Sequence, residues 1–264
     1  MSATHSGRAA LVTGGSGGIG RAICRRLASE GAFVAVHYFR GEAAAQEVVA
    51  DIERDGGKAI AIRGDISSYD EAEAVVAETL ANAGRLDILV NNSGITRNQL
   101  IMQMTESDWL DVMRVNFGGV FNGTRAASVA LARQDGAAIV NVSSVMGERA
   151  WLGASGYAAS KAAINSFTRA SALEFARFGI RVNAVLPGFV ETEMIADVLS
   201  AGGGDGIISQ VPVPGATTVD EVAELVPFLA APHTAHLSGA LIPIDGMGGG
   251  TLLLGKPLKK NARR

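Results

Sequence analysis

The segment Ala9-Ala-Leu-Val-Thr-Gly-Gly-Ser-Gly-Gly-Ile-Gly20 carries the strongest structural signal in this chain. Ala9–Thr13 is a short apolar run that predicts a buried strand, and Arg21–Glu30 has the composition of a helix. The glycines between them let the backbone approach a pyrophosphate, and the helix N-terminus supplies free N–H groups. A strand, a glycine-rich turn and a helix in this order predict the phosphate-binding start of a βαβ unit.

Two overlapping glycine patterns fit the turn. Gly15, Gly17 and Gly20 satisfy G-x-G-x-x-G, while Gly14, Gly18 and Gly20 satisfy the longer G-x-x-x-G-x-G. The sequence alone does not assign a role to each glycine. A tight turn that binds no ligand is the alternative to a cofactor site.

Six further apolar runs alternate with helical segments. Together they predict a Rossmann-type, doubly wound α/β fold, with a mostly parallel seven-stranded sheet and helices on both faces in a single domain. The 264 residues, 48% of them apolar, suit one such domain. The expected strands are Ala9–Thr13, Phe33–Tyr38, Ala59–Arg63, Asp87–Val90, Ile139–Val142, Arg181–Leu186 and Ala240–Ile244. The expected helices are Arg21–Glu30, Glu42–Arg54, Tyr69–Ala81, Glu106–Leu131, Gly156–Phe175 and Val219–Leu229.

The ends of the chain differ from this body. We expect residues 8–250 to form the catalytic domain, with a flexible leader at Met1–Gly7 and a substrate lid at about 190–215. Residues 251–264 form a basic tail, and we expect disorder over Lys256–Arg264.

The composition argues against several classes of protein. A net charge of −3 gives no reason to expect nucleic acid or an anionic membrane as a partner. No apolar run approaches the ~18–20 residues of a membrane-spanning helix. The single cysteine, Cys24, excludes an internal disulfide and favours a reducing cytoplasm. His233 and His236 lie close together but lack Cys or carboxylate partners, so we expect no metal.

The second expected strand runs into His37-Tyr-Phe-Arg40. An NAD enzyme would place an Asp or Glu here, to accept hydrogen bonds from the adenosine ribose, but no acid occurs before Glu42. The guanidinium of Arg40 suits a 2′-phosphate, although it is also consistent with an ordinary surface charge. The pattern favours NADPH over NADH.

Polar residues follow two more of the expected strands. Asp65 either accepts a hydrogen bond from the adenine amino group or caps the next helix. Asn91-Asn-Ser-Gly94 provides small and polar groups at the carboxyl edge of the sheet, where open α/β sheets bind ligands. Asn116 is an amide within an apolar run, so it is either a structural hydrogen-bonding group or part of a polar relay.

Asn141–Phe167 brings together the residues with acid–base chemistry. Ser144 follows a buried strand, and Tyr157 and Lys161 lie four positions apart on one face of a helix. A nearby ammonium stabilises a phenolate and lowers the pKa of tyrosine from about 10. The Tyr157 hydroxyl would then exchange a proton with a substrate oxygen that Ser144 holds.

In order and spacing, these motifs resemble the short-chain dehydrogenases/reductases over Arg8–Gly249. The resemblance rests on Thr13-Gly-x-x-x-Gly-x-Gly20, Asn91-Asn-x-Gly94, Asn116, Ser144, Tyr157-x-x-x-Lys161 and Pro187-Gly188. It implies that Tyr157 donates the proton, Ser144 orients the carbonyl oxygen, Lys161 lowers the Tyr157 pKa and binds the nicotinamide ribose, and Asn116 holds a relay water. It also implies a homotetramer built on the two long helices.

The implied cofactor is NADPH/NADP⁺. Its expected contacts, besides Tyr157 and Lys161, are Gly14, Ser16, Gly17, Gly18, Ile19, Gly20, Tyr38, Arg40, Asp65, Ile66, Asn92, Gly94, Pro187, Gly188, Val190 and Thr192. The expected substrate contacts are Ser144, Met146, Trp151 and Tyr157.

Within the family the chain is most similar to the 3-oxoacyl-[acyl-carrier-protein] reductases. Asn92-Ser-Gly-Ile-Thr-Arg-Asn98, Pro187-Gly-Phe-Val-Glu-Thr-Glu-Met194 and Ile207-Ile-Ser-Gln-Val-Pro212 carry this likeness. The implied substrate is a 3-oxoacyl thioester or a polyketide-like ketone. The chain departs from the subfamily pattern at Ser93, where alanine is usual, and at Gly17, where NADPH-dependent members often have Arg. The alternatives are a dehydrogenase of a sugar, steroid or other secondary alcohol, and a non-catalytic nucleotide-binding regulator.

Overall fold

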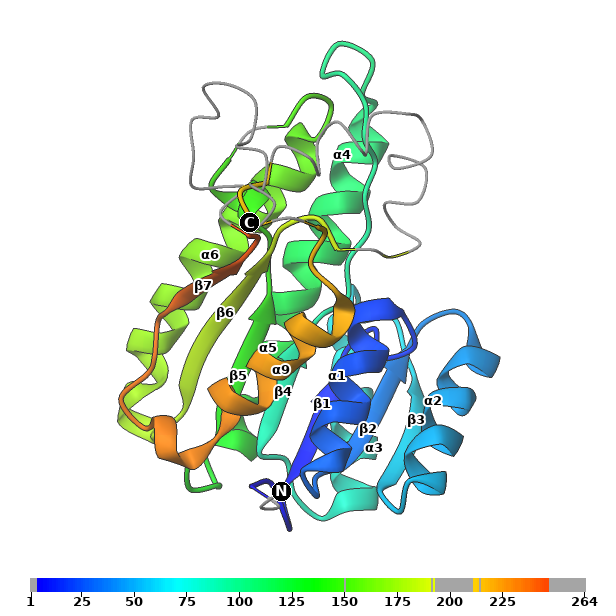
Figure 1. The fold of residues 1–264 in the computed structure, drawn as a ribbon, viewed down its shortest axis with the longest axis vertical. Helices are drawn as coiled ribbons and strands as arrows, with labels where there is room; N and C mark the ends of the chain where they lie inside the picture. Colours follow the sequence, from blue (N-terminus) through cyan, green and yellow to red (C-terminus); the bar gives the residue numbers. More distant parts are fainter. Residues whose placement is uncertain (1–3, 150, 191, 193–210, 214, 247–264) are drawn as a thin grey trace, which may run out of the picture.

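The chain forms one open, twisted sheet with helices on both faces (Figure 1). The computed structural model describes residues 4–149, 151–190, 192, 211–213 and 215–246. The strands are β1 (Ala9–Val12), β2 (Phe33–Tyr38), β3 (Lys58–Arg63), β4 (Ile88–Asn91), β5 (Ala138–Val142), β6 (Arg181–Pro187) and β7 (Leu241–Ile244). The helices are α1 (Gly18–Ser29), α2 (Glu42–Arg54), α3 (Tyr69–Ala83), α4 (Glu106–Val112), α5 (Gly119–Leu131), α6 (Ser155–Phe175) and α9 (Val219–Ala230).

The strand order is β3-β2-β1-β4-β5-β6-β7, and every pair is parallel. The expected Rossmann-type fold is therefore confirmed, and the described sheet is parallel throughout rather than mostly parallel. The direction of winding reverses between β1 and β4, so the loops after these two strands part from one another. This reversal opens a crevice at the carboxyl edge of the sheet.

Alternate side chains of each strand pack into opposite layers. On β1, Ala10 and Val12 face the layer of α1, α2 and α9, whereas Leu11 faces the layer of α3, α5 and α6. All three side chains are fully buried, as parallel strands covered on both faces require. Each buried side chain as large as Val or Leu stabilises the fold by about 1.5–3 kcal/mol.

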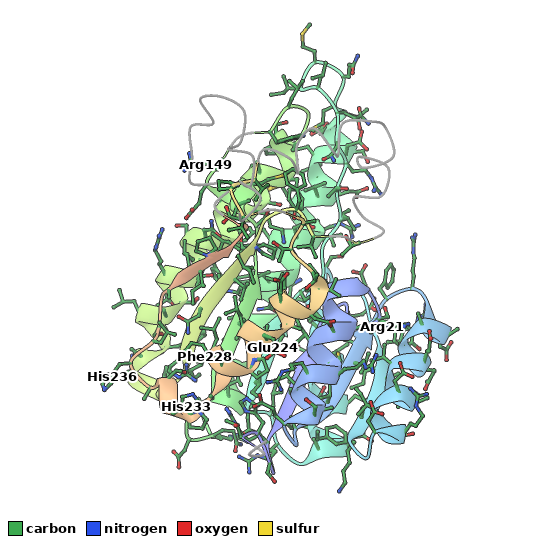
Figure 2. The ribbon with its side chains drawn as sticks, in the orientation of Figure 1. Arg21, Arg149, Glu224, Phe228, His233 and His236 are labelled. Carbon is green, nitrogen blue, oxygen red and sulfur yellow. The ribbon has the colours of Figure 1, made fainter. Side chains whose placement is uncertain are left out.

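Helix α9 lies beside α1 on one face of the sheet (Figure 1). Its outward side carries Glu224 and Phe228, with His233 just past its end (Figure 2). Arg26 of α1 donates from Nε to Oε1 of Glu224 at 2.8 Å. The opposite side of α9 is buried in the core through Val222 and Val226.

The expected helix over 106–131 contains a π-helical segment, Met113–Gly118, between α4 and α5. Its wider turn points Asn116 into the protein, where this side chain is fully buried. The composition predicted helix correctly but not this change of pitch. The helix widens at Asn116, whose buried amide forms hydrogen bonds with residues outside its own helix.

One residue of the expected leader, His5, contacts the body of the fold. The backbone N–H of His5 donates to Glu30 O at 3.0 Å, and its fully buried imidazole lies 3.1 Å from Pro227 O. The side chain of His5 thus packs on α9 at Pro227, and the flexibility of the leader stays a prediction. Residues 1–3, most of the expected lid (191, 193–210 and 214) and all of 251–264 lie outside the described residues.

Candidate active site

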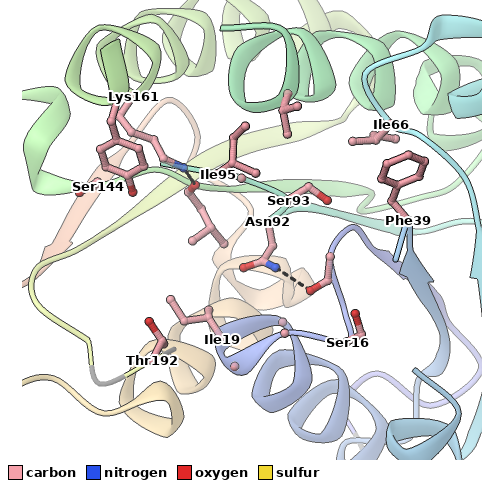
Figure 3. Close-up of a pocket in the computed structure, with 18 of the residues that line it drawn as sticks. Ser16, Ile19, Phe39, Ile66, Asn92, Ser93, Ile95, Ser144, Lys161 and Thr192 are labelled. Carbon is pink, nitrogen blue, oxygen red and sulfur yellow. Dashed lines mark hydrogen bonds between the residues drawn. The ribbon is translucent and has the colours of Figure 1, made fainter. Parts of the chain in front are cut away.

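A cavity of about 590 Å³ opens at the carboxyl edge of the sheet, over the crevice between β1 and β4. Ser144 and Lys161 lie at one end of it, while Phe39 and Ile66 lie at the other (Figure 3). The glycine-rich turn after β1 forms the floor between them. Its volume and position are those of a ligand site in an open α/β sheet.

Several backbone groups of the glycine turn are already bound within the protein. The N–H of Gly14 donates to His37 Nδ1 at 3.1 Å, and the N–H of Gly15 donates to His37 O at 2.8 Å. The N–H of Gly17 donates to Gly14 O at 3.3 Å. Among the N–H groups of this turn that have no acceptor in the described residues are those of Ser16, Gly18 and Ile19. These three donors at the start of α1 are free to donate to an anion.

The structure separates the roles of the glycines. A Cβ on Gly20 would lie 2.1 Å from Gly14 O, so only glycine fits there. Gly14 has a φ of +63°, in the left-handed region that glycine adopts without strain. A Cβ on Gly17 would lie 3.8 Å from its nearest neighbour, so that position tolerates a side chain. The longer glycine pattern therefore describes the backbone requirement better than the shorter one.

The far end of the cavity holds the residues expected at the adenosine. Arg40 is exposed, and its guanidinium carbon lies 5.4 Å from the centroid of the Phe39 ring. Within the described residues Arg40 makes no ion pair, so its charge is available to a ligand. Asp65 lines the cavity and accepts from the N–H and hydroxyl of Ser67 at 2.9 and 2.6 Å. The residue at the N-cap of α3 is Ser68, so the helix-cap reading of Asp65 is wrong.

The catalytic end begins where β5 ends. Ser144 Oγ accepts from the N–H of Met146 at 3.1 Å, which starts a short 3₁₀ turn over Val145–Gly147. A Cβ on Gly147 would lie 2.8 Å from the backbone carbon of Lys161, so glycine lets this turn press against α6. Because α6 is held against the end of β5, Ser144, Tyr157 and Lys161 line one end of one cavity.

The pKa of Tyr157 beside Lys161 differs from the expectation drawn from the sequence. Burial raises the pKa of Tyr157 to about 12, and a hydrogen bond with Ser144 offsets only part of that rise. Burial also lowers the pKa of Lys161 to about 8. The Lys161 ammonium donates to Val142 O at 2.9 Å and lies 5.5 Å from the centroid of the Tyr157 ring. The expected lowering of the Tyr157 pKa by Lys161 is thus absent, because burial disfavours the charged forms of both groups.

Asn116 joins two walls of the cavity. Its Oδ1 accepts from Ile95 N at 2.8 Å, and its Nδ2 donates to Ile95 O at 3.1 Å and to Ser160 Oγ at 3.0 Å. Ser160 in turn donates to Tyr157 O at 2.7 Å. The Asn116 side chain therefore links the loop after β4 to helix α6 through hydrogen bonds, which is the structural role. The relay role stays a prediction.

Most residues expected at the site line this one cavity. They are Gly14, Ser16, Gly17, Gly18, Ile19, Gly20, Tyr38, Arg40, Asp65, Ile66, Asn92, Gly94, Ser144, Tyr157, Lys161, Pro187, Gly188, Val190 and Thr192. Asn116, Met146 and Trp151 are not among the described residues that line it. The ring of Trp151 instead packs edge to face on Phe189, with centroids 5.4 Å apart.

The sequence did not single out His37 or Ser93, which also line the cavity. His37 falls inside an apolar strand, where the sequence pattern gives it no separate signal. Ser93 stands out in the sequence only as a departure from a family pattern. The signal that points to both is their adjacency to motif residues.

The residues present fit a dinucleotide. Three free N–H groups, a position where only glycine fits and an unpaired guanidinium lie along one cavity. Among the described residues there is no group of His, Cys, Asp or Glu that could hold a metal. The helices of the described part include none with the length and apolar character needed to cross a bilayer.

Comparison with known proteins agrees with this reading. Residues 8–201 match the family described as short chain dehydrogenase. The chain is 40% identical over 239 residues to the 3-oxoacyl-[acyl-carrier-protein] reductase FabG of Staphylococcus aureus (strain Mu50), covering 90% of this chain and 97% of the relative. It is 39% identical over 240 residues to the acetoacetyl-CoA reductase of Allochromatium vinosum, covering 90% and 97%.

A solved structure shares the whole architecture. A short chain dehydrogenase from Burkholderia cenocepacia J2315, in complex with NADP, superposes with a TM-score of 0.87 at 38% identity. The match covers 92% of this chain and 98% of that protein.

Proposed function

Because this chain belongs to the short-chain dehydrogenase/reductase family and is an oxidoreductase of that family, we propose that it is an NADPH-dependent ketoreductase. Its substrate is the ketone of a 3-oxoacyl thioester or of a polyketide-like molecule. The observation that carries this proposal is the presence of Ser144, Tyr157 and Lys161 at one end of a cavity whose floor is a phosphate-binding turn.

The protonation state of Tyr157 favours reduction. With its pKa raised to about 12, the phenol holds its proton at neutral pH, which is the form that a carbonyl reduction consumes. Ser144 Oγ hydrogen-bonds the same oxygen and fixes its position near the phenol. Lys161, with its pKa near 8, carries most of its charge at neutral pH and binds the ribose hydroxyls.

The cofactor, when bound, supplies the hydride, and the protein supplies alignment and the proton. The N–H groups of Ser16, Gly18 and Ile19 hold the pyrophosphate, and Asp65 accepts from the adenine. Thr192 meets the carboxamide of the nicotinamide. Tyr157 gives its proton to the carbonyl oxygen while the carbonyl carbon takes the hydride, and the product that leaves is the secondary alcohol.

The preference for NADPH rests on the charge at the end of β2. Arg40 is exposed at the cavity rim and makes no ion pair with the described residues. The phosphate of NADPH forms a charge-assisted hydrogen bond with such a guanidinium. One similar protein was solved in complex with NADP, which supports the same choice of cofactor.

The substrate class is proposed from the relatives. One is named for reduction of a 3-oxoacyl group on a carrier protein, and the other for reduction of acetoacetyl-CoA. Both substrates are 3-oxoacyl thioesters. The chain is therefore proposed to act on a 3-oxo group held by a thioester.

The test is to incubate the full chain with NADPH or NADH and a panel of ketones, and to follow the nicotinamide absorbance. Faster turnover of acetoacetyl-CoA with NADPH than with NADH is expected. Turnover only of a secondary alcohol with NADP⁺ would replace the proposal by the dehydrogenase alternative. Tight NADPH binding without turnover of any substrate would favour the alternative of a non-catalytic nucleotide-binding regulator.

A homotetramer is also proposed. Apolar side chains on α4, α5 and α6 are exposed in the single chain, with Leu110 at 53%, Val129 at 63% and Leu173 at 81%. Burying them between subunits removes this apolar surface from water. Sedimentation that shows a monomer at micromolar concentration would contradict it.

A further inference from the structure

His37 lies between two segments that form the cofactor cavity. It belongs to β2, has 1% of its surface exposed and lines the cavity. Its Nδ1 is 3.1 Å from Gly14 N in the phosphate-binding turn. Its Nε2 is 3.0 Å from Gly64 O, in the loop that leads to Asp65.

The two contacts define the tautomer of the ring. The N–H of Gly14 can only donate, so Nδ1 accepts. The carbonyl of Gly64 can only accept, so Nε2 carries the proton. The imidazole is therefore neutral, in agreement with burial, which lowers its pKa below the ordinary value.

The backbone of Gly14 is held on both sides by side chains of other segments. Its φ is +63°, and its carbonyl accepts from Asn92 Nδ2 at 3.1 Å and from Gly17 N at 3.3 Å. His37 therefore fixes the N–H side of this residue while Asn92 fixes the carbonyl side. The orientation of Gly14 in turn sets where the free N–H of Ser16 points, two residues later.

We propose that His37 is a positioning residue for the cofactor, which joins the phosphate-binding turn to the adenine-side loop through one neutral imidazole. It acts through Gly14 and Gly64 and does not itself touch the reacting atoms. This inference rests on the proposed function only in taking the ligand to be NADPH.

Two conservative variants separate the halves of this contact. In His37→Asn the amide oxygen can occupy the place of Nδ1 and accept from Gly14, whereas in His37→Gln the longer amide occupies the place of Nε2 and reaches only Gly64. The measurement is equilibrium binding of NADPH to the full chain by nicotinamide fluorescence, together with KM, kcat and Tm.

We expect His37→Gln to weaken NADPH binding by about tenfold, and kcat at saturating NADPH to stay near wild type. His37→Asn should keep affinity within about threefold, because it restores the acceptor for Gly14. Wild-type affinity in His37→Gln would overturn the proposal. Equal weakening in both variants that tracks a lower Tm would also overturn it, since His37 would then be a structural contact only.

The outcome is separable from that of the proposed function. If the wild-type chain binds NADPH with this pattern of variants but reduces no ketone, the ketoreductase proposal fails and the role of His37 stands. If ketones are reduced but both variants bind NADPH like wild type, the role of His37 fails and the ketoreductase stands.

Discussion

The two edges of the sheet both bury polar and charged side chains, yet they use them in opposite ways. At the amino edge, Arg8 donates to Ala230 O at 2.8 Å and to Gly136 O at 2.9 Å. Arg181 donates to Leu229 O at 2.6 Å and to Ala231 O at 3.0 Å. Most of these carbonyls lie at the end of α9. The last C=O groups of a helix have no N–H partner within that helix, so they accept from the two arginines instead.

At the carboxyl edge the donors are directed at a cavity instead. The N–H groups of Ser16 and Ile19 have no acceptor in the described residues, and the cavity also receives Tyr157 and Arg40. Buried charge is therefore not by itself the mark of a site. Donors that the protein leaves without acceptors, arranged around one cavity, are the better mark. The predictions below alter one edge at a time.

The largest effect is expected at the carboxyl edge. Tyr157→Phe removes the transferable proton and should lower kcat for ketone reduction by about 10²- to 10⁴-fold. NADPH affinity and Tm should stay near wild type, because only the hydroxyl is lost. Steady-state kinetics and a binding titration check this. A variant that keeps most of its rate would remove Tyr157 as the acid.

The amino edge should respond in stability alone. Arg181→Ala leaves the carbonyl of Leu229 without a donor among the described residues, whereas Ala231 O still accepts from Thr234, so the free energy of unfolding should fall by about 1–3 kcal/mol. Denaturant unfolding measures it, and kcat of the folded fraction should not change.

The matched control is Arg26→Ala. Its ion pair with Glu224 lies on the surface, so the expected loss is at most about 1 kcal/mol. Equal losses in the two variants would break the distinction between the buried network and a surface pair.

Cofactor choice is expected to change at Arg40. Arg40→Asp removes the phosphate partner and adds a charge that repels the phosphate. A charge-assisted contact of about 1.5–3 kcal/mol corresponds to a shift of about ten- to hundredfold toward NADH in the ratio of kcat/KM values. An unchanged ratio would place the phosphate at another part of the cavity.

A pair of glycine variants tests the turn itself. Gly20→Ala forces a Cβ against Gly14 O, at an expected cost of about 1–3 kcal/mol in NADPH binding. Gly17→Ala brings a Cβ only into van der Waals contact with Gly14 O, at 3.8 Å, and should bind NADPH within about twofold of wild type. Calorimetric titration of both variants decides it. A stronger defect in Gly17→Ala would favour the shorter glycine pattern.

The smallest effect is a dependence of stability on pH at the amino edge. Burial and the Arg8 guanidinium lower the pKa of His5 below its ordinary 6.5. The unfolded chain therefore takes up the proton first, so the stability from neutral His5 is complete above pH 6.5 and is lost as pH falls below it. The free energy of unfolding should therefore fall as the pH is lowered from 7 to 5.5.

His37 has a lowered pKa as well and contributes with the same sign, so the test compares variants. In His5→Gln the free energy of unfolding should depend less steeply on pH over this range. An unchanged slope would mean that His5 is not the group that titrates.

The fold and the list of site residues could be read from local patterns. The strand–glycine–helix start predicted the cofactor floor because the turn and the helix N-terminus are contiguous in the chain. The spacing of Tyr157 and Lys161 placed both on one face of α6 because helix geometry is local. The carboxyl-edge rule brought Asn92 and Gly94 to the same cavity.

Other features needed the tertiary structure, because they depend on partners far away in the chain. His37 meets Gly14 and Gly64 only once β1, β2 and β3 lie side by side. Asn116 finds Ile95 and Ser160 only through the π-helical turn.

The sequence by itself determined which groups can carry the chemistry of this protein, since residue type and local spacing set their charge, reach and relative direction. The tertiary structure decided the protonation equilibrium of Tyr157, whose pKa rises instead of falling because desolvation depends on every atom packed around the phenol. It likewise decided that the arginines of the amino edge bind carbonyls and not a ligand, because α9 ends beside them.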